Sequence, residues 1–148
     1  MVNPVPASGT FDGPLHRFPV RVYFEDTDLS GVVYHANYLR FMERARSDML
    51  ACVGIEQRAA FDAGEGVYAI ADLNMKFRGP ARLGDALVVE SRCIGVGGAT
   101  ATIQQRVMRA DVILTEATVI AAFLTPGGRP RRQPKPWVEI FERLMSNA

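Results

Sequence analysis

Residues 21–46 read RVYFEDTDLSGVVYHANYLRFMERAR, and this stretch contains a strand, a turn and the start of a long helix. The segment 18–25 alternates apolar and polar residues, as a half-buried strand does. Asp, Ser and Gly then gather in 26–33, which is the composition of a turn. From Asn37 to about Val53, apolar residues recur at three- and four-residue steps, and this spacing predicts an amphipathic helix.

The ends of this helix carry their own signals. Asn37 is the predicted N-cap, because its side chain can accept a hydrogen bond from a free backbone N–H of the first turn. Gly54 follows the last apolar residue and can end the helix. A shorter second helix is expected over 55–63, where Gly64 stops it.

The remainder of the chain changes to strand-like patterns. Glycine, proline and aspartate separate these patterns from one another. A short terminal helix is expected over 137–145. The order of elements predicts an α+β domain in which one long helix packs against a curved antiparallel sheet of about five strands. The strands after the helix are expected over 67–77, 86–94, 100–109 and 112–124.

The bulk properties describe an ordinary globular domain. The chain has 148 residues, a usual size for one core. We expect a flexible Pro/Gly/Ser-rich leader over 1–16 and a single domain over 17–148. The 17 basic and 16 acidic residues give a formal charge of +1, which argues against nucleic acid as the main partner. No apolar run approaches the roughly 20 residues of a membrane helix, and no signal peptide is evident, so we expect a cytoplasmic protein without stable membrane insertion.

The sequence predicts no metal site. Cys52 and Cys93 are expected to be small buried hydrophobic residues in a reducing compartment. Together with His16 and His35 they lack the spacing of a zinc site. Residues 26–31 match the first half of a calcium-binding EF-hand loop, but a strand precedes them where that motif needs a helix.

The chemically interesting groups lie within ten residues of one another. Asp28 is followed by a glycine turn, then by His35 and the start of the helix. The free N–H groups and partial positive charge of a helix start favour an oxygen that gains negative charge. A carboxylate facing that point could attack a carbonyl carbon or activate a water molecule. A thioester suits such a site, because its carbonyl is electrophilic and its thiolate leaves easily.

These residues resemble the hotdog-fold thioesterases of the 4-hydroxybenzoyl-CoA type, and within them the bacterial acyl-CoA thioesterases associated with the Tol-Pal envelope system. The shared pattern is an Asp-x-x-Gly turn, a Val, an aromatic-His pair, an Asn-Tyr step and a Glu-Arg-Ala-Arg helix segment. Further likeness lies in 77–82 (FRGPAR) and 127–131 (GGRPR). Relatives often have a tyrosine where this chain has Phe24, so a contribution from that hydroxyl is not expected here.

The resemblance implies hydrolysis of short-chain or aromatic acyl-CoA to a free acid and CoA, without a cofactor. It implies that Asp28 is the nucleophile or general base, and that the backbone N–H and ring of His35 assist. It also implies a homodimer joined edge to edge, usually doubled to a homotetramer, with acyl sites between subunits. The substrate-binding candidates are Gly31, Val33, Tyr34, Asn37, Arg82 and Arg131, the two arginines for the CoA phosphates.

Several alternatives stay open on the sequence alone. The thioester could be carried by CoA or by acyl carrier protein. The Asp28 carboxylate could form a covalent anhydride or only activate water. A nearby carboxylate, Asp26, could raise the pKa of Asp28. A protein that binds acyl groups as a scaffold, without turnover, is the competing function.

Overall fold

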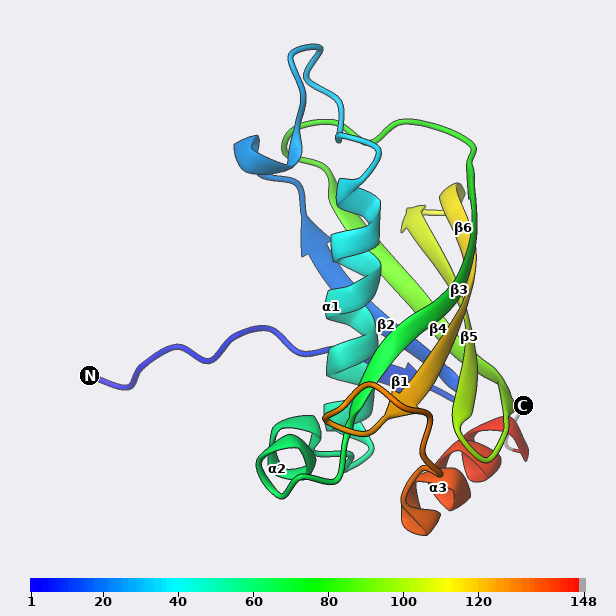
Figure 1. Ribbon diagram of the computed structural model, residues 1–148. Coiled ribbons are helices and arrows are strands. Elements are labelled where there is room, and N and C mark those ends of the chain that lie inside the picture. The colour runs from blue at the N-terminus through cyan, green and yellow to red at the C-terminus, as the bar shows by residue number, and fades with distance from the viewer. Residues whose placement is uncertain (147–148) are drawn as a thin grey trace.

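The structure, a computed structural model, describes residues 1–146 and consists of one antiparallel sheet curved around a long helix (Figure 1). This is the predicted α+β hotdog architecture, with six strands where about five were expected. The strand order across the sheet is β1-β2-β4-β5-β6-β3. The strands are β1 (Thr10–Asp12), β2 (Leu15–Arg21), β3 (Val67–Phe77), β4 (Ala86–Val96), β5 (Thr100–Arg109) and β6 (Val112–Leu124).

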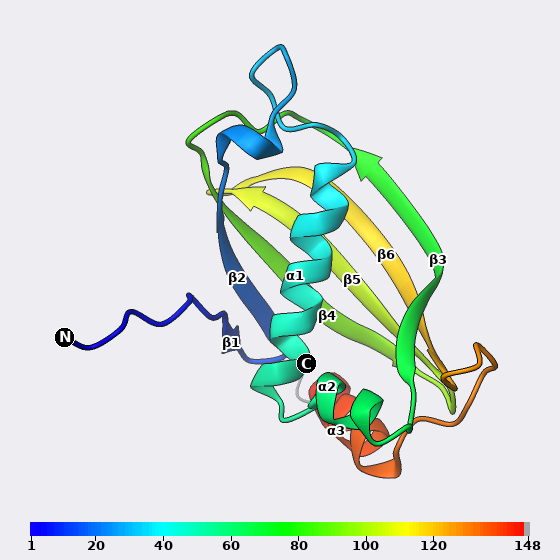
Figure 2. The ribbon, with the colours of Figure 1, turned by 60° about the vertical axis from the view of Figure 1, so that its left-hand side comes forward.

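The long helix α1 (Asn37–Cys52) lies across the concave face of the sheet (Figure 2). It packs over β2, β4 and β5, and its buried face meets the inward side chains of these strands. Two short helices, α2 (Gln57–Asp62) and α3 (Lys135–Ser146), lie beyond the C-terminal end of α1. Buried residues that join α1 to the sheet include Phe41, Met42, Ala45, Leu87, Val89 and Val107.

The N-terminal part of the chain differs from the predicted leader. Thr10–Asp12 forms a strand that pairs with β2 through a turn at Gly13, whose φ is +59°. His16 is fully buried, so the expected boundary between residues 16 and 17 falls inside β2. Pairing across a tight turn orders this segment despite its loop-like composition.

The strand predicted over 18–25 ends earlier than its alternating pattern suggests. β2 stops at Arg21, and a single turn of 3-10 helix occupies Phe24–Asp26. The Asp26 carboxylate accepts a hydrogen bond from the backbone N–H of Tyr23 at 2.8 Å and thereby stabilises this turn. Phe24, which the alternation placed on the buried face, is 82% exposed as a result.

The edge strand β3 leaves apolar side chains uncovered. A β-bulge at Ala71 shifts the pairing with β6 between Ile70 and Asp72. Ile70 and Leu73 pair with Ala121 and Val119 respectively, so the bulge keeps both on the concave face of the sheet. They are 49% and 38% exposed, because α1 does not reach this side of the sheet. Over residues 1–146 we find no helix long and apolar enough to cross a membrane.

Candidate active site

The Asp28 turn forms the tip of a small hairpin beside the N-terminal end of α1. Its two arms meet at a bridge between Thr27 and Val33. The N–H of Asp28 donates to the Val32 carbonyl at 2.9 Å, and the N–H of Gly31 donates to the Asp28 carbonyl at 3.1 Å. The loop extends beyond the sheet at the upper end of Figure 1. The arm that leaves the turn leads directly into His35 and the helix.

Ser30 holds the Asp28 carboxylate. The Ser30 hydroxyl and backbone N–H both donate to Oδ1 of Asp28, at 2.6 and 2.8 Å. These bonds, the hydroxyl bond first, lower the pKa of Asp28 below its ordinary value. The expectation that Asp26 could raise this pKa is therefore wrong: hydrogen bonding favours the charged form. The carboxylate is exposed and ionised at neutral pH, the state that a nucleophile or general base needs.

The start of α1 offers free hydrogen-bond donors. Within residues 1–146, the backbone N–H groups of His35 and Ala36 donate to no protein acceptor, whereas those of Tyr34 and Asn37 donate to backbone carbonyls. The His35 ring is exposed and lies 4.5 Å from the Tyr34 ring and 6.3 Å from the Phe77 ring, between centroids. No hydrogen bond joins it to Asp28 among these residues. The start of α1 thus has free backbone N–H groups, those of His35 and Ala36 among them.

Asn37 has a role different from the predicted N-cap. It is the first residue of α1, and the preceding Ala36 occupies the cap position without a side-chain bond. The buried amide of Asn37 donates to Oδ1 of Asp26 at 2.7 Å. Because the other oxygen of Asp26 holds Tyr23, this carboxylate fastens the 3-10 turn to the helix start. This bond of Asn37 therefore positions the backbone at the helix start.

Of the other motif residues, Val33 and Gly31 support the backbone of the hairpin, and Tyr34 lies at the surface. Val33 is buried in the core, and its N–H donates to the Ala81 carbonyl at 2.9 Å, which anchors the hairpin to the neighbouring loop. Gly31 has a φ of +81°, which only glycine adopts freely, and a Cβ there would meet open space. Tyr34 is 50% exposed at the mouth of the site.

The two arginines predicted for the CoA phosphates lie at opposite ends of the subunit. The backbone of Arg82 bridges Val32, so its exposed side chain stands near the Asp28 hairpin. Arg131 lies near α2, where its guanidinium donates to the carbonyls of Gly64 and Glu65 at 3.2 and 2.6 Å. One copy of the chain therefore does not bring Arg82 and Arg131 together.

An apolar cavity of about 170 Å³ lies between the C-terminal half of α1 and the sheet. The guanidinium of Arg46 enters its wall and donates to Oε1 of the buried Gln105 at 2.8 Å. Burial lowers the pKa of Arg46. The cavity lies at the end of α1 away from Asp28, and its lining includes Glu43, Arg46, Leu50, Tyr68, Ile70 and Phe141.

Sequence reasoning missed two features. One is Ser30, whose position two residues after Asp28 is the spacing of an Asx turn and was the available signal. The other is a group of possible metal ligands formed by His16, Asp48 and Cys52. Cys52 is exposed, contrary to the expectation of a buried residue, whereas Cys93 is buried as expected. Asp48 and Cys52 lie four apart on α1, a spacing that places both on one helix face.

Comparisons with known proteins show the family of the chain. Residues 30–116 match the family model described as the thioesterase superfamily. An acyl-CoA thioesterase YbgC of Haemophilus influenzae is 40% identical over 128 residues, covering 86% of this chain and 94% of the relative. An acyl-CoA thioester hydrolase YbgC of Escherichia coli is 37% identical, covering 87% and 97%.

Solved structures show the same fold. A probable thioesterase from Bartonella henselae superposes with a TM-score of 0.77 and 33% identity, covering 81% of this chain and 99% of that one. The match to the family model spans more than half of the sequence, and the curated relatives match over nearly their full length. The chain belongs to the thioesterase superfamily, as the Asp28–Arg46 motif predicted.

Proposed function

We propose that this protein hydrolyses acyl-CoA thioesters to a free acid and CoA. The observation that carries the proposal is the pairing of an exposed, ionised carboxylate at Asp28 with free backbone N–H groups at the start of α1. Relatives that match almost from end to end are acyl-CoA thioesterases by name, which supports the same reaction here.

The reaction follows from the charges at the site. The N–H groups of His35 and Ala36 bind the thioester oxygen and stabilise the negative charge that develops on it. The Asp28 carboxylate either attacks the carbonyl carbon, giving an anhydride that water cleaves, or removes a proton from an attacking water. In both routes the C–S bond breaks and CoA leaves as a thiolate. The His35 ring, packed beside Tyr34 and Phe77, helps to hold the acyl group.

A second copy of the chain completes the site in this proposal. Antiparallel pairing of two β3 edges creates a two-fold axis and turns one copy end for end relative to the other. The Asp28 end of one copy then faces the cavity end of its partner, and the acyl group can enter that cavity. The same arrangement brings Arg82 of one copy toward Arg131 of the partner subunit. A phosphate-bearing ligand that spans the two copies would then contact both arginines.

The substrate class follows from the cavity. Its volume of about 170 Å³ and mainly apolar lining suit a short-chain or aromatic acyl group. CoA is the proposed carrier, and acyl carrier protein is the alternative. Association with Tol-Pal proteins and a cytoplasmic location stay predictions of the sequence.

Thiol release from short, long and aromatic acyl-CoA thioesters tests the function, with wild type compared with Asp28→Asn. We expect turnover in the wild type and a loss of at least about 100-fold in the variant, since general acid–base catalysis contributes roughly 10²–10⁴-fold. Glu25→Gln, an exposed carboxylate three residues earlier, is the matched control and should keep wild-type activity.

Three outcomes would contradict the proposal in different ways. Equal activity of Asp28→Asn and wild type would remove Asp28 from the mechanism. Activity on acyl carrier protein thioesters alone would replace CoA as the carrier. Binding of acyl-CoA without any turnover would support the scaffold function instead.

A further inference from the structure

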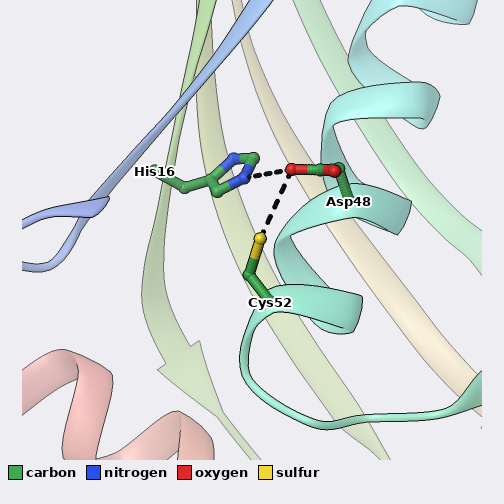
Figure 3. A group of neighbouring side chains, drawn as sticks. All are labelled: His16, Asp48 and Cys52. Carbon is green, nitrogen blue, oxygen red and sulfur yellow. Dashed lines mark hydrogen bonds and ion pairs between the residues drawn. The ribbon is translucent and has the colours of Figure 1, made fainter. Parts of the chain in front are cut away.

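A second cluster of reactive side chains lies toward the C-terminal end of α1, and the proposed hydrolysis does not use it (Figure 3). His16 on β2 and Asp48 and Cys52 on α1 direct their side chains toward one another. Nε2 of His16 lies 2.8 Å from Oδ2 of Asp48, and Sγ of Cys52 lies 3.5 Å from the same oxygen. All three ligand atoms lie within 4.8 Å of one another.

The fold fixes two sides of this cluster. The His16 ring is fully buried beside the rings of Phe11 and Phe18, at centroid distances of 5.2 and 6.5 Å. Within the described residues, its Nδ1 has no hydrogen-bond partner, so Nε2 is the nitrogen directed into the cluster. Asp48 and Cys52 reach the same point from successive turns of one helix. The exposed Cys52 leaves the cluster open to solvent on one side.

We propose that His16, Asp48 and Cys52 bind a Zn²⁺ ion. Imidazole nitrogen, carboxylate oxygen and thiolate sulfur are the donors that zinc takes in tetrahedral sites. Bond lengths of about 2.0–2.3 Å place tetrahedral ligand atoms roughly 3.3–3.6 Å apart. The Sγ–Oδ2 separation of 3.5 Å already fits. The Nε2–Oδ2 separation of 2.8 Å must open by about half an ångström, a side-chain movement, as the ion replaces a hydrogen bond.

The nitrogen, oxygen and sulfur donors of this cluster favour zinc over calcium and magnesium. Calcium and magnesium require several oxygen ligands, whereas this cluster offers one carboxylate with a nitrogen and a sulfur. Zinc binding releases the Cys52 thiol proton to water and uses the lone pair of a neutral His16. Activation of Cys52 as a nucleophile is a weaker interpretation, because the thiol contacts Asp48 and not a histidine that could take its proton.

The ion would fasten the N-terminal segment to α1. Asp48 also accepts hydrogen bonds from the N–H of Gly9 at 2.8 Å and the hydroxyl of Ser8 at 2.9 Å. Gly9 permits this approach, since a Cβ there would lie 2.6 Å from Nε2 of His16. Three protein ligands leave a fourth position, which a water molecule beside Ser8 would fill. The site therefore joins β2, α1 and the segment before β1, and it replaces the sequence-based expectation of no metal.

Zinc titration of the full-length protein tests the proposal. Metal-stripped protein competes for Zn²⁺ with a chromophoric chelator, and Co²⁺ serves as a spectroscopic probe of thiolate ligation. Wild type should bind one Zn²⁺ per chain and show a thiolate-to-Co²⁺ charge-transfer band. Cys52→Ala should lose the band and weaken zinc binding by at least the roughly 10- to 100-fold that loss of a supporting contact to a metal ligand costs. Cys93→Ala, which removes the other thiol, should behave as wild type.

A second variant separates the cluster from a lone surface thiol. His16→Phe keeps an aromatic ring beside Phe11 and Phe18 and removes Nε2, so it should lose tight zinc binding while remaining folded by circular dichroism. Zinc should raise the Tm of the wild type more than that of Cys52→Ala at the same concentration, because stabilisation of the native state falls as binding weakens. Zinc affinity in His16→Phe or Cys52→Ala equal to that of the wild type, or no binding by the wild type, would overturn the proposal.

Discussion

Two hydrogen bonds from Ser30 hold the carboxylate of Asp28, the residue on which the proposed reaction depends. The Ser30 hydroxyl lies 2.6 Å from Oδ1 of Asp28 and is the largest cause of the lowered pKa of that carboxyl. The rate should therefore fall only when the pH drops below the ordinary range of an aspartate. Ser30→Ala removes the hydroxyl bond but keeps the backbone N–H bond at 2.8 Å.

We expect the acid limb of the kcat/KM pH profile to move to higher pH in Ser30→Ala. With a higher pKa, the carboxylate takes up its proton at a higher pH as the pH falls, so the rate begins to fall at a higher pH. Activity at neutral and alkaline pH should change little, since the carboxylate is ionised there in both proteins. Ser30→Thr keeps the hydroxyl and serves as the control. An unchanged acid limb in Ser30→Ala would show that Asp28 does not set it.

For single residues, the sequence predicted where the site residues lie better than it predicted their hydrogen-bond partners. The motif placed Asp28, His35 and the helix start together, and the structure places all three at one end of α1. The bond between Asn37 and Asp26 was missed, because an N-cap pattern does not show which other side chain competes for the amide. The contact between His16 and Asp48 spans 32 positions, a separation that local patterns cannot detect.

Between elements, one buried glutamine connects the sheet to the helix. Gln105 on β5 is fully buried, and its amide donates to the Met42 carbonyl and the Ser91 hydroxyl, each at 2.9 Å. Its oxygen accepts the hydrogen bond from Arg46 at 2.8 Å. These bonds satisfy polar groups inside an otherwise apolar interface, where an unpaired group is costly.

Gln105→Met should lower the free energy of unfolding by roughly 1–3 kcal/mol, because it leaves Ser91 and Arg46 without their buried partner. Urea denaturation monitored by circular dichroism measures the change. The adjacent Gln104 points to the opposite face of β5 and is half-buried. Gln104→Met should therefore stay within about 0.5 kcal/mol of the wild type. Equal losses of unfolding free energy in both variants would mean that the hydrogen bonds of Gln105 contribute no more to stability than an ordinary surface position does.

Strands bounded by glycine or aspartate turns were predicted with correct first and last residues. Segments that become ordered only by pairing with another part of the chain were not predicted. Residues 67–77, 100–109 and 112–124 form strands with the predicted bounds. Gly and Asp turns bound these strands on both sides. Thr10–Asp12 became a strand only by pairing with β2, although its surroundings are rich in glycine and proline. Phe24 followed the alternation of a strand but left the sheet, because Asp26 stabilises a turn there.

At the scale of the whole molecule, the uncovered β3 edge is where a second copy would bind. Within residues 1–146, β3 has a neighbour on one side only, β6, and its concave face exposes Ile70 and Leu73. An edge strand with exposed apolar side chains favours pairing with another chain. The proposed site needs that pairing, because the Asp28 turn lies beside the N-terminal end of α1 and the cavity lies at its C-terminal half.

Leu73→Lys should convert the proposed homodimer, or dimer of dimers, into monomers, because a lysine on an edge strand opposes pairing and Leu73 does not line the cavity. Ile94→Lys is the control: Ile94 is 47% exposed, against 38% for Leu73, but lies on β4, which has β2 and β5 as neighbours. Sedimentation velocity measures assembly, and acyl-CoA turnover is recorded on the same samples. An assembled Leu73→Lys protein would place the interface elsewhere. Monomers that keep full activity would show that one copy is sufficient, whereas joint loss of assembly and turnover would mean that each Asp28 acts on an acyl group held by its partner.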